Sequence, residues 1–198
     1  MTVRRLLIGA VAAAALLAGC ADEEPKGGTD RDDVPATLLQ REDLPEVEKV
    51  STDDRSVLTR TNCAAMEGEY NLTITDSDDV SALYVLADGD QVRSSLQGPA
   101  QNQTTIDHTI DQVDAAITEC LTADIPSGSF ERIEGLPDGA VGFRTVQDTS
   151  EGPQTTERVY APADDDTAVV VTVDHLGEGE PSVTAAELLP QAVQRAQG

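Results

Sequence analysis

The sequence has no tryptophan and few other aromatic residues, only three Tyr and two Phe among 198 residues. A hydrophobic core must therefore be built mainly from small aliphatic side chains. Basic residues are also scarce: 13 Lys and Arg stand against 37 Asp and Glu, for a formal net charge of −24. This shortage argues against nucleic-acid binding, which needs grouped basic side chains, and against docking of the protein body on anionic lipid headgroups.

The chain also lacks a hydrophobic run long enough to cross a membrane as a helix. Its apolar N-terminal run, residues 6–18, has 13 residues, whereas the hydrocarbon core requires about 20. The run follows Arg4 and Arg5 and ends in small residues, as in a secretory signal peptide, which we assign to residues 1–19. We favour the general export route over twin-arginine export, because the Phe and Lys positions expected after an arginine pair are missing.

Cys20 directly follows Leu17, Ala18 and Gly19 at the end of this segment. The ending resembles the lipobox of bacterial lipoproteins, in which the Cys thiol receives a diacylglycerol and the chain is cleaved just before it. Two or three acyl chains hold a protein stably on a membrane. The resemblance implies a lipid anchor on Cys20 and a location on the outer face of the cytoplasmic membrane. The alternative is an ordinary cleaved secretory peptide with an accidental Cys.

Cysteine is rare as well, with three residues in all. If Cys20 carries lipid, Cys63 and Cys120 remain, and an even pair in an oxidising compartment predicts a disulfide. The chain-entropy treatment of a loop of this length gives at most about 4 kcal/mol of stabilisation. Two free buried thiols are the alternative interpretation.

The rest of the chain divides into a tether and one domain. Residues 20–36 have Gly, Pro and mixed charge without an apolar pattern, so we predict a lipidated N-terminus and a flexible acidic tether. Residues 37–198 match the usual size of a single core. Before residue 100 we predict a short helix at 36–42 and three strands at 70–74, 80–87 and 91–97. The last two strands should be joined by a hairpin at Asp88-Gly89.

The clearest element is a helix predicted over residues 104–121. Apolar residues recur there every three or four positions, ending with Ile117 and Cys120, so Cys120 should face the core. Thr104 and Asp107 resemble a capping box.

After this helix the pattern predicts four strands, at 129–134, 140–147, 155–161 and 167–175. A terminal helix should begin at Thr184 with Glu187 as its capping partner, and Pro190 should kink or split it. Hairpins followed by helices predict an α+β domain, an antiparallel sheet with helices packed on one face and one disulfide.

The two histidines are the first candidates for catalysis or metal binding. His108 lies off the apolar stripe of its helix, and His175 points away from Asp174 on the last strand, so both are predicted as surface residues. The motifs of serine hydrolases, zinc proteases, nucleotide-binding loops and dinucleotide-binding folds are all missing. We therefore predict a non-enzymatic protein with no catalytic residue, metal site or cofactor.

Acidic residues cluster at 76–79, 88–90 and 164–166. Carboxylate oxygens suit Ca²⁺, but none of these clusters has the ligand spacing of an EF-hand. Each coincides with a predicted turn, where Asp is favoured by backbone hydrogen bonding, so solvated turns are the preferred interpretation.

The mature chain resembles the actinobacterial lipoproteins related to the extracellular sensor domain of mycobacterial transmembrane Ser/Thr kinases. The shared features are the lipobox, the opening Leu38-Leu39…Asp43-Leu44-Pro45, Cys63, the hairpin, and a helix that ends in Cys120. The chain departs from that pattern by having cysteines for one bridge only, and Ile117 where an aromatic residue is usual. The resemblance implies an α+β domain whose cleft is thought to receive a small ligand, without identifying ligand-binding residues.

Two functions follow as expectations. The first is a membrane-anchored, non-enzymatic ligand-binding or sensor-like module; the alternative is a structural lipoprotein that contacts other envelope proteins. Removing residues 1–19, with their two Arg and no acid, leaves 11 basic against 37 acidic residues and a formal charge of −26. This field disfavours anions, so a neutral, cationic or apolar ligand is expected.

Overall fold

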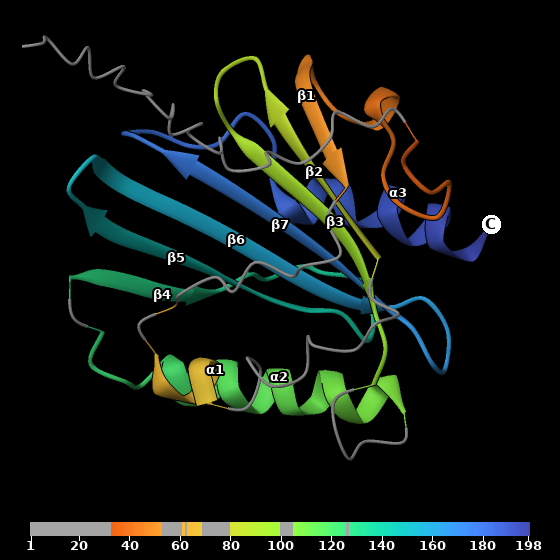
Figure 1. Ribbon diagram of the computed structural model, residues 1–198. Helices are drawn as coiled ribbons and strands as arrows, with labels where there is room; N and C mark the ends of the chain where they lie inside the picture. Colours follow the sequence, from red (N-terminus) through yellow and green to blue (C-terminus); the bar gives the residue numbers. More distant parts are fainter. Residues whose placement is uncertain (1–32, 53–60, 62, 69–79, 100–104, 126) are drawn as a thin grey trace, which may run out of the picture.

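The protein folds around one sheet of seven antiparallel strands, in the order β1-β2-β3-β7-β6-β5-β4 (Figure 1). The computed structural model describes residues 33–52, 61, 63–68, 80–99, 105–125 and 127–198. The strands are β1 (Val47–Thr52), β2 (Val80–Leu86), β3 (Gln91–Gln97), β4 (Gly128–Arg132), β5 (Val141–Thr149), β6 (Gly152–Pro162) and β7 (Ala168–Leu176). The helices are the short 3-10 helix η1 (Arg41–Asp43), α1 (Ala64–Gly68), α2 (Ile106–Cys120) and α3 (Ala185–Gln197). The predicted α+β class and antiparallel sheet are confirmed.

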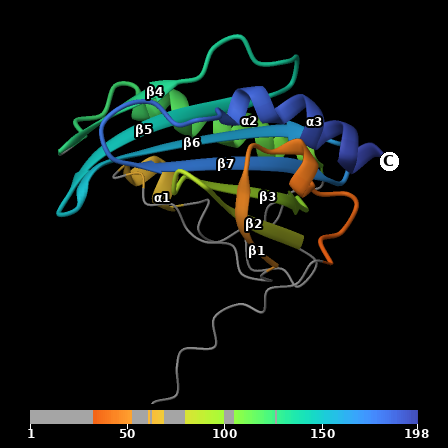
Figure 2. The same cartoon turned by 90° about the horizontal axis from the view of Figure 1, so that it is seen from above.

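Helices cover both faces of the sheet, not one as predicted. α3 packs on β6 and β7 in a core with Val159, Val171 and Val173, and we call this side the α3 face. α1 and α2 pack with Phe143, Tyr160 and Val170 on the opposite side, the α2 face (Figures 1 and 2). Successive residues of a strand point to opposite faces, so strands that are apolar at every position must be covered on both.

The two faces are covered to different extents. On the α3 face the core extends from β6 across β7 and β3 to β2, and Val92 of β3 and Tyr84 of β2 are fully buried. On the α2 face the helix packs on β5 and β6, beside the stacked rings of Phe130 and Phe143, whose centroids lie 5.1 Å apart. In Figure 1, α1 and α2 lie beside β4, away from β2.

Local signals in the sequence account for most element ends. The β2–β3 hairpin turns at Asp88-Gly89 as predicted, with Gly89 at φ +94° and the Asp90 N–H donating to Asp88 Oδ1 at 3.0 Å. The capping box of Thr184 and Glu187 at the start of α3 is also confirmed. At α2 the cap is Thr105, whose side chain accepts from the His108 N–H; Thr104 lies outside the described residues.

Three predictions for local structure were wrong or incomplete. A turn and η1 replace the helix predicted over 36–42. β1, a charged edge strand, and α1 were not predicted. α3 is one continuous helix through Pro190, so it is not split into two short helices at that residue. The strand predicted at 70–74, the acidic cluster 76–79, the signal segment 1–19, Cys20 and most of the tether lie outside the described residues.

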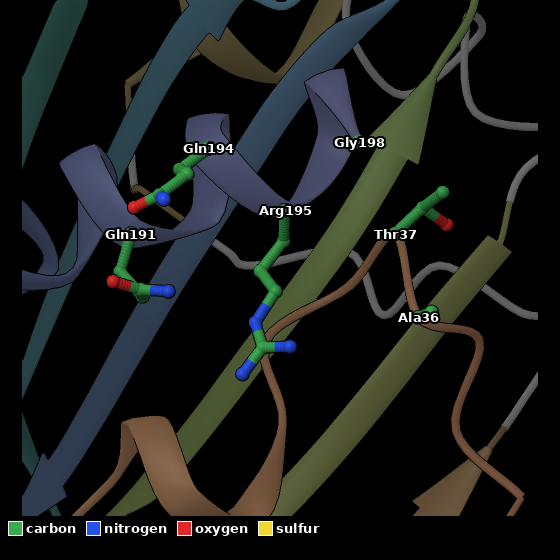
Figure 3. A pocket seen from close by; sticks show the side chains of 6 residues that line it. All are labelled: Ala36, Thr37, Gln191, Gln194, Arg195 and Gly198. Carbon is green, nitrogen blue, oxygen red and sulfur yellow. The ribbon is translucent and has the colours of Figure 1, made fainter.

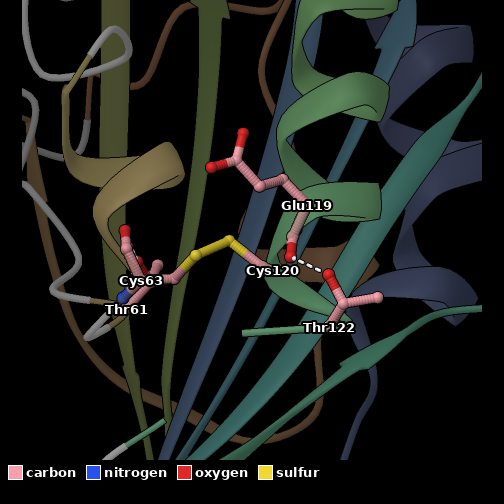
Figure 4. Close-up of a disulfide and its surroundings, with 5 residues drawn as sticks. All are labelled: Thr61, Cys63, Glu119, Cys120 and Thr122. Atoms are coloured by element: carbon pink, nitrogen blue, oxygen red, sulfur yellow. Dashed lines mark hydrogen bonds between the residues drawn. A yellow bond between two sulfur atoms is a disulfide. The ribbon is translucent and has the colours of Figure 1, made fainter. Parts of the chain in front are cut away.

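The predicted disulfide between Cys63 and Cys120 is confirmed (Figure 4). The two residues are 57 positions apart in sequence and their Cα atoms are 5.9 Å apart. Both are buried in the α2-face core with Met66 and Ile117, as the position of Cys120 on the apolar stripe predicted. The bridge joins the residue just before α1 to the last residue of α2.

Within the described ranges no helix has the length and apolar character needed to cross a membrane.

Candidate functional site

Buried polar side chains interrupt the apolar surface of the sheet on the α2 face. Thr156, Arg158 and Thr172 are at most 9 % exposed, and Asp174 and Arg93 are partly buried. Cross-strand pairing places Arg158 and Arg93 on either side of Thr172, and Thr156 opposite Asp174. Paired residues in an antiparallel sheet point to the same face. We call these five residues the sheet cluster.

Hydrogen bonds hold the sheet cluster in place. Arg158 donates from Nε to Thr172 Oγ1 at 3.0 Å and from Nη1 to the Tyr160 hydroxyl at 3.5 Å. Thr156 donates its hydroxyl hydrogen to Asp174 Oδ1. A buried guanidinium is costly unless its donors are satisfied, so these bonds are what allow Arg158 to lie inside the domain.

Burial raises the pKa of Asp174 above its usual range. The hydrogen bond from Thr156 and the charges of Arg158 and Arg93 act in the opposite direction without reversing the shift. The carboxylate form is therefore less stable in the folded protein than in water. Charged groups placed at a net cost to stability are concentrated at functional sites. The sheet cluster is therefore the leading candidate for a functional site in this protein.

The raised pKa of Asp174 predicts greater stability in mild acid. An acid with a raised folded pKa takes up a proton in the folded state first, so the free energy of unfolding should rise as pH falls from 7 towards about 4. Burial raises the pKa of Glu157 in the same direction. Asp174→Asn removes the titrating group and should flatten this pH dependence. Urea unfolding of the wild type and the variant at pH 7 and pH 5 measures the effect; an equally steep pH dependence in the variant would contradict the assignment.

A second polar cluster lies on the α3 face at the same end of the sheet. His175 Nδ1 is 2.6 Å from Asp90 Oδ1, and the other Asp90 oxygen accepts from the Ser182 backbone N–H at 2.8 Å and from its hydroxyl at 3.1 Å. Asp90 is 3 % exposed and the His175 side chain 17 %. The prediction that His175 is a surface residue was therefore wrong, as was the solvated turn at Asp90. His108 is exposed, as predicted.

The Asp90–His175–Ser182 cluster joins the hairpin, the end of β7 and the segment before α3. It lacks the order of a nucleophile–base–acid relay, because the Ser182 hydroxyl bonds to the carboxylate and not to the imidazole. His175 Nε2 is buried without a hydrogen-bond partner among the described residues. The arrangement of Asp90, His175 and Ser182 is that of a structural clamp.

A pocket of about 350 Å³ lies between the last turns of α3 and the segment at Ala36 and Thr37 (Figure 3). The charged side chain at its wall is Arg195, which points towards η1 in Figure 3 and donates to both Asp43 oxygens, at 2.9 and 3.0 Å. It also donates to Glu42 at 3.0 Å. With its charge already matched, this pocket offers weak recognition for a ligand.

Neither a metal site nor a related protein assigns a function to the described part of the chain. Across the described ranges no group of three His, Cys, Asp or Glu residues is arranged to hold a metal ion. The acidic turn at 164–166 has Asp164 Oδ1 accepting from the Asp166 N–H at 2.9 Å, the backbone role expected for Asp in a turn. No protein family matches this chain, and no curated protein matches its sequence.

Proposed function

We propose that the protein is a lipid-anchored, extracytoplasmic and non-enzymatic module that binds a small ligand at the sheet cluster. The observation that carries the proposal is the burial of Arg158 and Asp174 on a sheet face where apolar residues would serve the core better. Polar groups converging among apolar and aromatic side chains are typical of small-molecule sites. The resemblance to sensor-domain lipoproteins points in the same direction.

Catalysis is disfavoured by the two histidines. His108 is exposed on the solvent side of α2. His175 uses Nδ1 to contact Asp90, and the nearby hydroxyl of Ser182 is also bonded to Asp90, so neither prepares a nucleophile. The role that remains for the sheet cluster is recognition, which uses the same charges without moving a proton.

Native mass spectrometry of the protein purified from its own host tests the binding function. We expect an additional small mass on the wild type that is reduced in Arg158→Gln and kept in Arg144→Gln. Arg144 is the matched control because it lies on the α3 face, where it pairs with Glu157 at 3.8 Å and Glu180 at 2.6 Å. An empty protein that instead co-purifies with an envelope protein would favour the alternative, an interaction lipoprotein.

The anchor is tested at Cys20. Cys20→Ser removes the thiol that would be acylated, so most of the protein should leave the membrane fraction or remain unprocessed. Gly19→Ala keeps a small residue before the cysteine and should retain the wild-type distribution. Fractionation with immunoblotting measures both variants. Cleavage and membrane retention of Cys20→Ser at wild-type levels would refute the lipoprotein assignment.

A further inference from the structure

β4 is an edge strand, because the strand order ends with it and the described residues pair with it on one side only (Figure 1). The hydrogen bonds at its two ends show which of its backbone groups face β5. Ser127 and Ile133, the residues just outside β4, bond to β5 through their backbones at 3.1 and 3.0 Å. Inward bonding alternates along an antiparallel pair, so Ser129 and Glu131 also bond to β5.

The other three residues of β4 present their backbone to the open side of the strand. Gly128, Phe130 and Arg132 occupy the alternate positions, so their N–H and C=O groups point away from β5. No described residue forms a hydrogen bond with these outward groups. Gly128 and its neighbour Ser129 are exposed. A row of unpaired backbone groups on an accessible edge is a template for one more strand.

The opposite edge strand of the sheet, β1, is protected against such pairing. Its register shifts between Val47 and Lys49, which interrupts the regular row of backbone groups. The Val47 carbonyl accepts from Arg41 Nη1 at 2.5 Å, and Lys49 is exposed on the strand. Irregular register and lysine side chains are common ways of blocking an edge. β4, by contrast, pairs with β5 in one register from Gly128 to Arg132.

The charged side chain exposed on the β4 edge is acidic. Glu131 lies opposite Arg144 on the α3 face and is exposed. Arg144 is engaged elsewhere, with Glu157 at 3.8 Å and Glu180 at 2.6 Å, so Glu131 has no ion-pair partner among the described residues. Opposite charges on neighbouring strands stabilise their pairing. A Lys or Arg on an added strand is therefore favoured beside Glu131, and the net charge of −24 attracts a basic segment from a longer distance.

We propose that the β4 edge binds an extended, basic segment of another protein, which joins the sheet as one further strand. Backbone hydrogen bonds to Gly128, Phe130 and Arg132 supply the affinity, and a Lys or Arg beside Glu131 supplies the preference for a basic sequence. A second copy of this chain is a poorer occupant, because each copy carries −24. The edge is separate from the sheet cluster, so failure of this proposal leaves the small-ligand function standing.

The probe is a synthetic peptide of about seven residues that alternates lysine and valine, the length of an ordinary strand. A glutamate–valine peptide tests charge, and two lysine–valine peptides test backbone bonding, one N-methylated at every valine and the other at every lysine. Binding of the labelled peptides to the full-length protein is measured by fluorescence anisotropy at fixed salt.

The lysine–valine peptide should bind at least about tenfold more tightly than the glutamate–valine peptide. Successive nitrogens of a strand point to opposite sides, so one methylated peptide should lose binding and the other should keep it. Equal affinities of the lysine and glutamate peptides, or equal losses in the two methylated peptides, would overturn the proposal.

Charge reversal at Glu131 separates recognition from damage to the fold. Glu131→Lys should weaken binding of the lysine peptide and strengthen binding of the glutamate peptide, each by about threefold or more. A damaged fold would not produce the gain. Glu48→Lys is the matched control, because it makes the same charge change on β1, the other edge strand. It should leave both affinities within about twofold, and equal responses of the two variants would overturn the proposal.

Hydrogen exchange followed by NMR locates the bound peptide. The outward N–H groups of Phe130 and Arg132 should become protected when the lysine peptide is added, while the N–H groups of β1 should not change. Protection on β1 alone, or on neither edge, would overturn the proposal. Protection of Phe130 and Arg132 without peptide, in a protein that sediments as a dimer, would also overturn it by assigning the edge to a second copy.

Discussion

Replacing Cys63 and Cys120 together with serine is expected to lower the free energy of unfolding by about 2–4 kcal/mol. The bridge links residues 57 positions apart, and its removal restores conformational freedom to the unfolded chain. Loss of the bridge also removes the covalent link between α1 and α2 on the face that carries the sheet cluster. Urea unfolding of the variant and the wild type, with and without reductant, measures the loss.

Reductant supplies the control for this experiment. It should destabilise the wild type by a similar amount and leave the serine variant unchanged. A second pair, Cys63→Ala with Cys120→Ala, shows how much of the loss comes from placing hydroxyl groups in an apolar core. Labelling of both thiols in the unreduced, denatured wild type would show that the bridge does not form in the cell.

Asp90→Ala is expected to cost about 3 kcal/mol, because it leaves the Ser182 N–H and the buried imidazole of His175 without their shared acceptor. His175→Ala should cost about 1–2 kcal/mol, since Ser182 still bonds to Asp90 in that variant. Chemical denaturation measures both variants.

His108→Ala is the matched control for the clamp, and its stability should stay within about 0.5 kcal/mol of the wild type because His108 is exposed. Equal stabilities for His108→Ala, His175→Ala and Asp90→Ala would show that the clamp contributes nothing. A loss confined to Asp90→Ala would instead assign the stabilisation to the contact between Asp90 and Ser182.

The sequence predicted elements whose signals are local. The stripe that ends in Ile117 and Cys120, the Asp88-Gly89 turn and the Thr184 cap each depend on residues within a few positions, and each is confirmed. β1 was missed because its Glu and Lys residues break the apolar alternation, as is common on edge strands. The two-sided covering was missed although the consecutive valines Val169–Val171 of β7 indicated it.

The candidate sites could not be predicted because register creates them. Asp90 and His175 are 85 positions apart. Arg93 and Arg158 are both opposite Thr172 only because β7 pairs with both β3 and β6. No short motif marks such a pairing. The signal that was available is a pair of charged residues, Glu157 and Arg158, at the centre of a predicted strand.

The strand order has a consequence for how the chain reaches its folded state. β7 is the last strand in sequence, yet it lies between β3 and β6 and joins the two halves of the sheet. Until residues 168–176 have been synthesised, both halves have an open edge and cannot be joined through β7. Such long-range pairing makes folding slow. Completion of the sheet is therefore coupled to synthesis of residues 168–176, and the two halves stay separate until that late segment is available.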